Sequence, residues 1–529
     1  MSELLHNLPL RAADRAPDAL ALHFKKASTT YAALARDINR FAAGVVSLGV
    51  GHQERVAIYL PKQPETVIAM FGAARTGCVF VPVNPILKPA QVAYILRDCN
   101  VRVLVTSPER ATELTMTLNE CPDLQHLVLV GDARFETTLP KIRVHAWSEL
   151  LQASDSTPGH RVIDADVVSI LYTSGSTGSP KGVVLSHRNM VTGAHSVASY
   201  LGNTFGDKLL AVLPFSFDYG FSQLSTAFHV GASVVLIDYL FSKDVISACA
   251  RERVTGLAGV PPLWQQLADL DWPQEARESL RYITNSGGAM PVAILGKLRA
   301  ALPKTKPYLM YGLTEAFRST YLPPEEVERR PESMGKAIPN AQILVVRPDG
   351  TACAPNEPGE LVHRGSLVSL GYWNDPVKTA ERFKPTPNQP GGLVLTEMAV
   401  WSGDTVKMDE EGFLYFVGRR DEMIKTSGYR VSPTEVEEIV YATGMVTEAV
   451  AVGVPDAALG QAIVLVAAAT PGGTADSARL IDECRKRLPQ FMVPTAVVWR
   501  ETLPRNPNGK FDRPKIAVEI REQFAVARS

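Results

Sequence analysis

A segment rich in hydroxyl groups and glycines lies between two apolar stretches of this sequence. Residues 172–183, YTSGSTGSPKGV, follow the apolar VVSIL and precede VLSHRN. In a loop of this composition, backbone N–H groups, hydroxyls and one ammonium can converge on phosphate oxygens. A flexible Gly/Ser linker is the alternative, but a linker seldom holds one ordered Pro-Lys-Gly between apolar stretches. The segment therefore predicts phosphate contacts from Thr173, Ser174, Gly175, Ser176, Thr177, Gly178 and Lys181.

The spacing within this loop excludes the common P-loop. That motif requires Gly-x-x-x-x-Gly-Lys-Ser/Thr. Here Ser179 and Pro180 stand between Gly178 and Lys181, and Gly182 follows the lysine. A phosphate site at this loop is therefore of another type.

Two later segments combine residue types that suit a nucleotide. The glycines of NSGGAM (285–290) allow a flat base to lie against the backbone, although an ordinary turn after a strand would look the same. MYGLTE (310–315) places an aromatic ring, a hydroxyl and a carboxylate within one turn. Taken alone, Tyr311 could instead be a core residue and Glu315 a helix-cap carboxylate.

These segments, in this order, resemble the AMP-forming ligase superfamily, which contains acyl-CoA synthetases, the adenylation domains of peptide synthetases and luciferases. The similarity covers nearly the whole chain. It implies an ATP-dependent acid–thiol ligase that forms an acyl-adenylate from a small-molecule carboxylate. The acyl group would then pass to the thiol of CoA or of the phosphopantetheine on a carrier protein, and Mg²⁺ would assist the first step.

The resemblance assigns roles to the residues of the nucleotide site. Gly288, Ala289 and Met290 correspond to neighbours of the adenine, although the family usually has proline in place of Met290. The family's adenine-stacking ring, phosphate-binding hydroxyl and Mg²⁺-binding carboxylate correspond to Tyr311 (with Gly312 beside it), Thr314 and Glu315.

Segments nearer the C-terminus complete the resemblance. WSGD and GRRD correspond to the ribose site, with Asp404 and Arg419 as its contacts. Arg430 corresponds to the arginine that reaches the ATP phosphates. Lys510, in PRNPNGK, corresponds to the lysine that bridges the attacking carboxylate and the α-phosphate. A charged interdomain linker and a solvated lysine on a turn are the alternatives.

The family rotates its small domain between the two half-reactions. The resemblance places the hinge at Asp421 and the thiol tunnel at Lys425 and Gly428, where glycine would let a pantetheine arm approach the backbone. The catalytic set that the family implies is therefore Lys181, Thr314, Glu315, Arg430 and Lys510.

The substrate pocket is implied by LPFSFDYG (213–220) together with Met310. Phe217 and Asp218, followed by Tyr219, resemble the Phe-Asp pair of amino-acid adenylation domains, whose aspartate binds the α-ammonium. A small amino or imino acid is thus one interpretation, and an Asp218 that caps a helix is the alternative. Arg318 could pair with Asp218, pair with a second acid group on the substrate, or point to solvent.

The elements that must position these residues alternate between strands and helices. Apolar stretches such as 55–61, 78–85 and 101–107 predict strands, and Thr30 can cap a helix over 31–48. This βαβ alternation predicts parallel strands, whereas short strands with Asp-Gly and Glu-Gly turns after residue 329 predict an antiparallel, barrel-like subdomain. The predicted fold is α/β, with a large domain over 1–420 and a small, mobile α+β domain over 421–529.

The small domain opens with a helix-start signal. Ser432, Pro433 and Glu435 predict a capping box and a helix over 433–442. The pattern that follows predicts strands over 448–454, 462–469 and 496–500, a helix over 475–488, and a turn over 506–509.

Composition excludes several classes of protein. The chain has 529 residues and a formal net charge of −1, which argues against a general nucleic-acid binder. Its six cysteines include no C-x-x-C pair, which favours reduced thiols and a cytoplasmic location over disulfides or a zinc site. Charge and proline interrupt the N-terminal segment, so we expect no signal peptide. No apolar run approaches the ~20 residues of a membrane span.

Three other interpretations of the function stand beside the amino-acid ligase. A medium-chain or aryl carboxylate–CoA ligase would use the same machinery on another acid. A luciferase-like oxidative enzyme would react the adenylate with O₂, which Lys425 and Gly428 on the thiol side disfavour. A non-catalytic adenylate-binding module would have no reason to keep Lys510.

Overall fold

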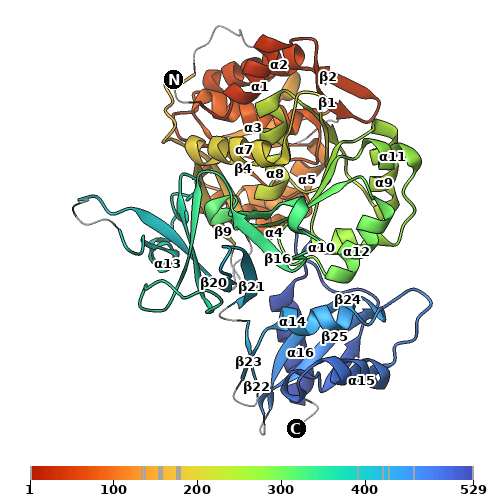
Figure 1. The fold of residues 1–529 in the computed structure, drawn as a ribbon. Coiled ribbons are helices and arrows are strands. Elements are labelled where there is room, and N and C mark those ends of the chain that lie inside the picture. Colours follow the sequence, from red (N-terminus) through yellow and green to blue (C-terminus); the bar gives the residue numbers. More distant parts are fainter. Residues whose placement is uncertain are drawn as a thin grey trace.

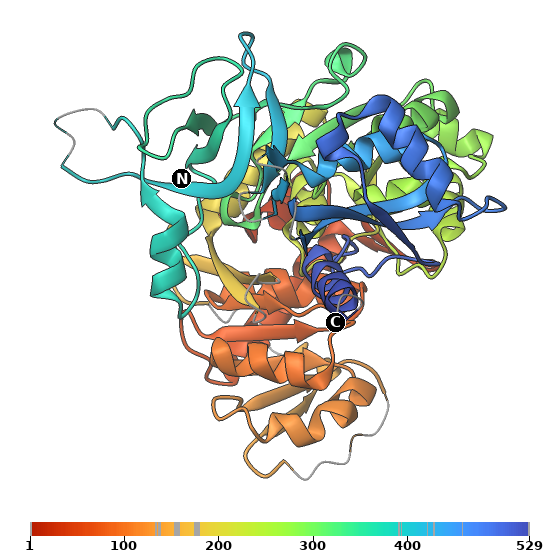
Figure 2. The same cartoon turned by 90° about the horizontal axis from the view of Figure 1, so that it is seen from below.

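The computed structural model describes residues 3–132, 135, 139–152, 159–173, 180–389, 392, 394–419, 422–426, 429–456 and 459–526. Figure 1 shows two bodies, of which the smaller, in blue at the lower end, is formed by the C-terminal segment. We call the described residues up to 419 the large domain and those from 422 the small domain. Seen from below, the small domain lies in front of the large one (Figure 2).

The first sheet of the large domain is built from βαβ units, as the alternation predicts. Neighbouring strands pair in parallel except β8 and β9, which pair antiparallel. The order is β7 (Arg143–Ala146), β6 (His126–Leu129), β5 (Val101–Thr106), β3 (Arg55–Tyr59), β4 (Val79–Pro82), β8 (Val167–Thr173) and β9 (Lys181–Ser186). The helices of this part of the chain are α2 (Tyr31–Ser47), α3 (Pro64–Thr76), α4 (Pro89–Asp98), α5 (Pro108–Leu118) and α6 (Trp147–Leu150).

Helix α2 forms as its local sequence predicts. Thr30 accepts a hydrogen bond at Oγ1 from the N–H of Ala33, at 3.2 Å, and so satisfies one of the donors at the helix start. The apolar positions Leu34, Ile38 and Phe41 are all fully buried. An apolar stripe with this spacing lies on one face of a helix and packs against the core.

The second sheet joins a parallel half to an antiparallel half. Pairing is parallel from β14 to β1, and antiparallel between β1 and β2 and from β14 to β17. The order is β2 (Ala27–Thr30), β1 (Leu20–Phe24), β11 (Ser233–Leu236), β10 (Lys208–Ala211), β12 (Gly256–Gly259), β13 (Tyr282–Asn285), β14 (Lys306–Tyr311), β15 (Thr320–Leu322), β16 (Ser333–Ala337), β21 (Leu414–Arg419), β20 (Met398–Met408), β18 (Gly359–Gly365) and β17 (Ala341–Val346), with β19 (Phe383–Pro385) beside β20. The strands after residue 329 are thus antiparallel, as predicted, but they continue the larger sheet.

Helices surround this second sheet and carry much of the candidate site. They are α1 (Asn7–Arg15), α7 (His187–Leu201), α8 (Asp218–Val230), α9 (Ser242–Glu252), α10 (Pro261–Ala268), α11 (Gln274–Ser279), α12 (Val292–Ala301) and α13 (Pro376–Arg382). Two 3₁₀ turns, η1 (Thr314–Ala316) and η2 (Pro324–Glu326), follow β14 and β15.

The small domain is α+β, in agreement with the prediction. Its elements are β22 (Ile424–Thr426), β23 (Tyr429–Val431), α14 (Pro433–Tyr441), β24 (Val446–Asp456), β25 (Gly460–Ala469), α15 (Ser477–Arg487), η3 (Gln490–Met492), β26 (Ala496–Trp499) and α16 (Arg513–Val526). Strands β24 and β25 form an antiparallel pair, and β26 joins β25 in parallel. The domain has apolar cores of its own, in which Val436 and Leu465 pack on one face of β24–β25 and Val464 and Ile516 on the other.

The predicted capping box at the start of α14 is wrong. Ser432 is the N-cap residue and Pro433 the first helical residue, but within the described residues the Ser432 side chain makes no cap hydrogen bond. Its Oγ lies 2.7 Å from the Oγ1 of Thr434 instead. A local hydroxyl pair therefore replaces the bond that the sequence signal indicates.

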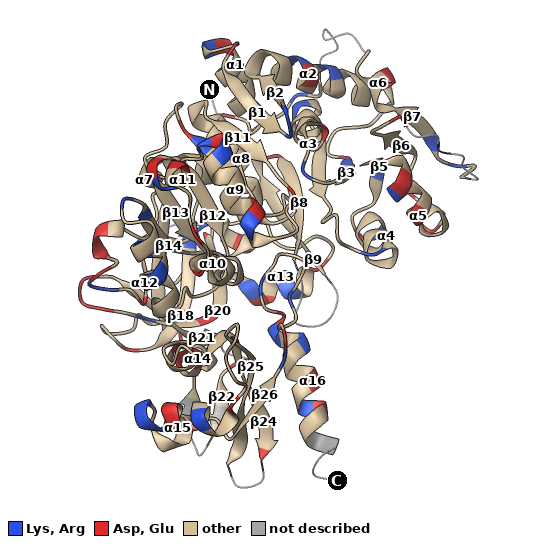
Figure 3. Ribbon diagram, turned by 90° about the vertical axis from the view of Figure 1, so that its right-hand side faces the viewer, with Lys and Arg blue, Asp and Glu red and all other residues tan. Residues whose placement is uncertain are grey.

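The charged residues and the cysteines are distributed as the composition suggests. Basic and acidic residues are interspersed along the helices of both domains (Figure 3). All six cysteines are free, and Cys353 is the one that is not fully buried. None of the described helices combines the length and apolar character that crossing a bilayer requires.

Candidate active site

The hydroxyl-rich segment lies at the end of the β8–β9 pair. Thr173 and Lys181 face each other across these two strands. The predicted contacts Ser174, Gly175, Ser176, Thr177 and Gly178 lie outside the described residues. The Lys181 Nζ is 5.2 Å from the centre of the Tyr372 ring. Burial lowers the pKa of Lys181, and the cations of Lys378 and Arg382 act in the same direction.

The carboxylate of Glu315 and this lysine lie beside the same tyrosine. The Tyr372 hydroxyl donates a hydrogen bond to Glu315 Oε1 at 2.5 Å. Burial raises the pKa of Tyr372 above its usual range, so the phenol is a proton donor at neutral pH. A carboxylate and a hydroxyl close to a lysine form a site for phosphate together with a hard cation.

Tyr311 and Asp404 come together from strands of the two halves of the second sheet. The hydroxyl of Tyr311, at the end of β14, donates to Asp404 Oδ2 at 2.6 Å. Asp404 is buried in β20, where it faces Arg419 of β21 in register. Only the backbone of Arg419 is described. An aromatic ring next to a carboxylate can hold a base and a ribose hydroxyl.

The loop after β13 meets the C-terminal lysine. Gly287 has a φ of +82°, and a Cβ built on it would lie 2.4 Å from Lys510 Cε and 2.9 Å from Lys510 Nζ. The same ammonium is 4.6 Å from the centre of the Phe217 ring. The adjoining backbone is fixed by Asn285, whose side chain donates to the Gly288 carbonyl at 2.9 Å. Lys510 therefore reaches from the small domain into the space between this loop and the start of α8.

Hydrogen bonds between the domains hold the lysine in this position. Asn84, which follows β4, donates to the Pro507 carbonyl at 2.8 Å. The N–H of Val292 donates to Glu438 at 2.9 Å. Within the turn itself, Asn506 Oδ1 accepts from the N–H of Lys510 at 3.1 Å. The contacts of Asn84 and Val292 join the large domain to the small one.

Asp218 and Arg318 form a buried ion pair. Arg318 Nη1 donates to Asp218 Oδ2 at 2.7 Å, and Thr314 donates to the other carboxylate oxygen at 3.1 Å. The two residues are 3% and 1% exposed. Of the alternatives that the sequence leaves open for Arg318, the structure shows the pair with Asp218, and solvent exposure is wrong. Asp218 is the first residue of α8, and Phe217 stands at its N-cap position, so Asp218 is not the helix cap.

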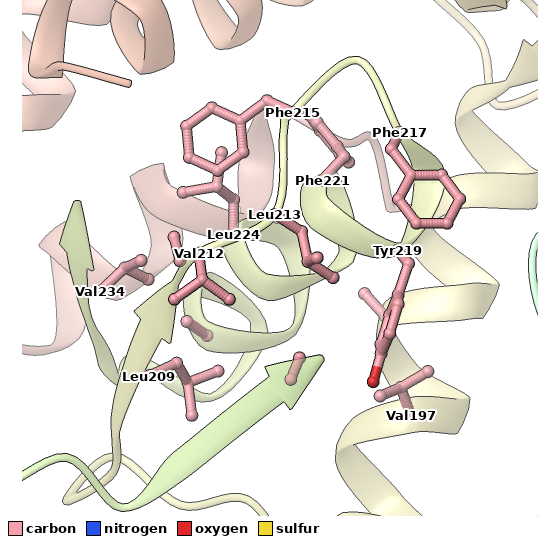
Figure 4. Close-up of a cluster of buried hydrophobic side chains, with 14 of the residues drawn as sticks. Val197, Leu209, Val212, Leu213, Phe215, Phe217, Tyr219, Phe221, Leu224 and Val234 are labelled. Carbon is pink, nitrogen blue, oxygen red and sulfur yellow. The ribbon is translucent and has the colours of Figure 1, made fainter. Parts of the chain in front are cut away.

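A small cavity adjoins this ion pair. Three residues of the predicted pocket, Tyr219, Met310 and Arg318, lie in its wall, whereas Phe217 and Asp218 lie outside it. The full lining is Val197, Leu201, Leu209, Tyr219, Ser222, Gln223, Thr226, Tyr282, Thr284, Met310 and Arg318. Figure 4 shows Tyr219 extending from α8 toward Val197 of α7, beside the packed apolar cluster of Phe215 and Phe221.

The remaining predicted residues are described in part or not at all. Gly288 and Ala289 are in the loop after β13, and Met290 is buried next to them. Asp421 and Gly428 lie outside the described residues. Lys425 and Arg430 face each other across β22 and β23, but their side chains are not described. Their roles stay predictions.

The structure adds residues that sequence reasoning missed. Tyr372 joins Lys181 to Glu315, Asn84 holds the lysine turn, and Thr284 meets the Tyr219 hydroxyl at 2.5 Å. Among these, Asn84 carries a signal in the sequence, because it stands near the end of an apolar stretch that predicts a strand.

Two family models match the chain. The model of the AMP-binding enzymes matches residues 10–373, and that of the AMP-binding enzyme C-terminal domain matches residues 435–510. The chain belongs to the AMP-binding enzyme family. The resemblance drawn from the sequence motifs is thereby confirmed.

Similar members of this family differ in length. The L-proline–[L-prolyl-carrier protein] ligase of Pseudomonas fluorescens is 30% identical over 98% of this chain and 99% of its own. Tyrocidine synthase 3 of Brevibacillus parabrevis is also 30% identical over 97% of this chain, but the chain spans only 8% of that protein.

Solved structures of a CoA ligase and of a coenzyme A synthetase have the same fold as this chain. The anthranilate CoA ligase AuaEII in complex with anthranoyl-AMP superposes with a TM-score of 0.89 at 24% identity, over 99% of this chain and 98% of its own. O-succinylbenzoate coenzyme A synthetase from Bacillus subtilis, in complex with ATP and magnesium, gives 0.78 at 25% identity, over 96% and 98%. The predicted α/β fold is confirmed.

Proposed function

We propose that this protein is an ATP-dependent, AMP-forming acid–thiol ligase. A substrate carboxylate attacks the α-phosphate of ATP, which releases pyrophosphate and leaves an acyl-adenylate. A thiol then attacks the acyl carbon, giving a thioester and AMP. The position of Lys510, between the Gly287 loop and Phe217, carries this proposal.

The first step brings two anions together, so catalysis must come mainly from positioned charge. Lys510 would bridge the attacking carboxylate and the α-phosphate. Lys181 would hold the departing pyrophosphate. Tyr372, beside this lysine, would orient the carboxylate of Glu315 through its hydrogen bond. Thr314 would contact a phosphate, and Arg430 would reach the phosphates from the small domain.

The adenosine would lie between the two halves of the second sheet. Tyr311 would stack on the adenine, with Gly312 beside it and Gly288, Ala289 and Met290 on the other side. Asp404 and Arg419 would bind the ribose hydroxyls. The 2.6 Å bond between Tyr311 and Asp404 supports this placement, because it sets the ring and the carboxylate on one side of the site.

The donor set around Glu315 fits Mg²⁺. A carboxylate whose oxygen is held by a phenol hydroxyl offers the hard oxygen ligands that this ion prefers. Glu315 would hold the ion, and when bound it would neutralise charge on the phosphate oxygens. The complex of the 25% identical synthetase with ATP and magnesium supports this assignment.

The acceptor would be CoA or a carrier-protein phosphopantetheine. The relative that acts on a prolyl-carrier protein supports the second choice, and it also supports a small amino or imino acid as substrate. We propose that thiolation follows a rotation about Asp421 that brings Lys425 and Gly428 to the thiol. Six free cysteines support a reducing, cytoplasmic location.

ATP–pyrophosphate exchange over a panel of acids tests the reaction class. Lys510→Ala should lower exchange by about 10²–10³-fold, because one preorganised charge is lost. Thioester formation from a supplied acyl-adenylate should survive. Lys515→Ala, which removes an exposed lysine of the same domain, is the control and should leave both half-reactions intact. Equal loss of both half-reactions in Lys510→Ala would contradict the proposed role.

A further inference from the structure

Arg318 makes its contacts with one of its two terminal nitrogens. Nη1 donates to Asp218 Oδ2 at 2.7 Å and to the Phe317 carbonyl at 2.9 Å. A guanidinium carries five N–H donors, so three N–H groups remain on Nε and Nη2. These two nitrogens are buried and have no hydrogen-bond partner among the described residues.

The side chain that bears these nitrogens lies in the wall of the cavity described above. The Thr226 Oγ1, in the same wall, is likewise buried and without a hydrogen-bond partner among the described residues. A buried donor of a charged group left unpaired is costly. Two residues of the cavity lining thus carry unsatisfied polar atoms.

The Nε–Nη2 edge has the shape that binds a carboxylate. Two N–H groups on that edge are parallel and match the two oxygens of a carboxylate. The plane of the guanidinium is fixed, because its centre lies 4.6 Å from the centre of the Tyr219 ring while Asp218 holds Nη1. An edge held in this way is preorganised for a planar anion.

The charge of the site agrees with this geometry. Asp218 and Arg318 cancel each other's charge, so Asp218 does not need a ligand ammonium to be neutralised. A guanidinium can bind a second carboxylate on a free edge while it keeps the first. The lining of the cavity also includes the apolar side chains of Val197, Leu201 and Leu209.

We propose that the acid activated by this protein carries a second carboxylate, remote from the one that is adenylated, and that Arg318 binds it through Nε and Nη2. The inference rests on the proposed ligase function and names its substrate class. The cavity has a volume of about 10 Å³, which is room for a group about the size of one water molecule, so we expect a dicarboxylic acid with a short hydrocarbon spacer. An amino group on that acid is compatible with the site but is not what selects it.

The test compares matched acids in ATP–pyrophosphate exchange with the wild type. The scaffolds are the straight-chain acids from succinate to adipate and the aromatic phthalates. Each scaffold is supplied as the diacid, as its monoamide and as the corresponding monoacid. Amino acids, L-proline and L-glutamate included, complete the panel. We expect kcat/KM for the best diacid to exceed that of its monoamide and monoacid by about tenfold to a hundredfold, since a charge-assisted contact is lost. If the kcat/KM of a monoacid or of L-proline equals or exceeds that of every diacid, the inference is wrong.

Two variants separate recognition from structural support. Arg318→Lys keeps the positive charge near Asp218 but has no fork, so the preference for the diacid over its monoacid should fall about tenfold or more. Asp218→Asn combined with Arg318→Met keeps the site neutral and should reverse the preference. If both variants melt like the wild type and lower kcat/KM for every acid by the same factor, Arg318 only supports the structure and the inference is wrong.

A binding measurement separates this inference from the ligase function. Thermal stabilisation by each acid is recorded without ATP, where the inference expects a larger shift for the diacid than for its monoamide. If a diacid stabilises the protein but no acid supports exchange, the proposed ligase function is refuted while the proposed carboxylate site at Arg318 is retained. Exchange with monoacids alone would refute the carboxylate site and keep the ligase.

Discussion

Gly287→Ala should displace the catalytic lysine without changing it. Apolar atoms in contact lie about 3.5 Å apart or more, whereas the new Cβ would be 2.4 Å from Lys510 Cε. The side-chain tip must therefore move by roughly 1 Å, a displacement that can cost a reaction about 10²-fold. Because Gly287 has a φ of +82°, alanine also adds about 1–2 kcal/mol of backbone strain to the folded state.

The assay is again the comparison of half-reactions. Pyrophosphate exchange should fall about 10²-fold, whereas thioester formation from a supplied adenylate should stay within about twofold of the wild type. In the Lys510→Ala background, Gly287→Ala should cause little further loss, because the group that it displaces is already gone. Gly296→Ala is the control, since its new Cβ would meet nothing within 4 Å on the exposed face of α12.

One result would refute this reasoning directly. If Gly287→Ala lowers exchange by the same 10²-fold factor with and without Lys510, the two effects are independent. The damage would then arise in the loop after β13, through the nucleotide, and not through the lysine. Melting curves of all variants must show the folded protein at the assay temperature.

Three further predictions follow from the site and the core. Tyr372→Phe removes the bond that orients Glu315 and should raise the Mg²⁺ concentration for half-maximal exchange about tenfold; an unchanged Mg²⁺ dependence would speak against Glu315 as the ligand. Asp404→Asn should raise KM for ATP about tenfold and reduce any preference for ATP over 2′-deoxy-ATP, and an unaltered preference would exclude the ribose contact. Burial lowers the pKa of His363 to about 3. Below pH 6.5 this histidine therefore binds a proton in the unfolded chain but stays neutral in the folded chain. Stability from neutral His363 is therefore lost as the pH falls, by about 2 kcal/mol between pH 6.5 and 5. Urea unfolding of His363→Gln should show a smaller loss over that range, and an identical loss would refute the assignment.

Local signals allowed much of the fold to be predicted. Thr30 and the apolar stripe of α2 lie within one helix, so the information needed is contiguous in the chain. The capping-box prediction was wrong for an equally local reason. Ser432 had a second hydroxyl two residues away, and Thr434 competed successfully for its side chain. Propensity patterns do not decide between two such local partners.

The site could be predicted only where a motif holds both partners. Tyr372 contacts Glu315 across 57 residues, and Asn84 contacts Pro507 across 423, so no spacing rule connects them. The sequence placed Asp218 and Arg318 in one pocket but left several partners open. Which of these forms depends on the backbone path between β14 and α8, and only the folded chain specifies that path.

The hydrogen bond from Thr314 to Asp218 has a consequence for changing what this protein accepts. A substitution at Asp218 alters the partner of a residue in the nucleotide motif, so new specificity introduced there would disturb turnover as well. Val197 and Leu201, on α7, also line the cavity and belong to neither the motif nor the ion pair. Directed evolution toward longer or bulkier acids should therefore find its first productive changes on α7.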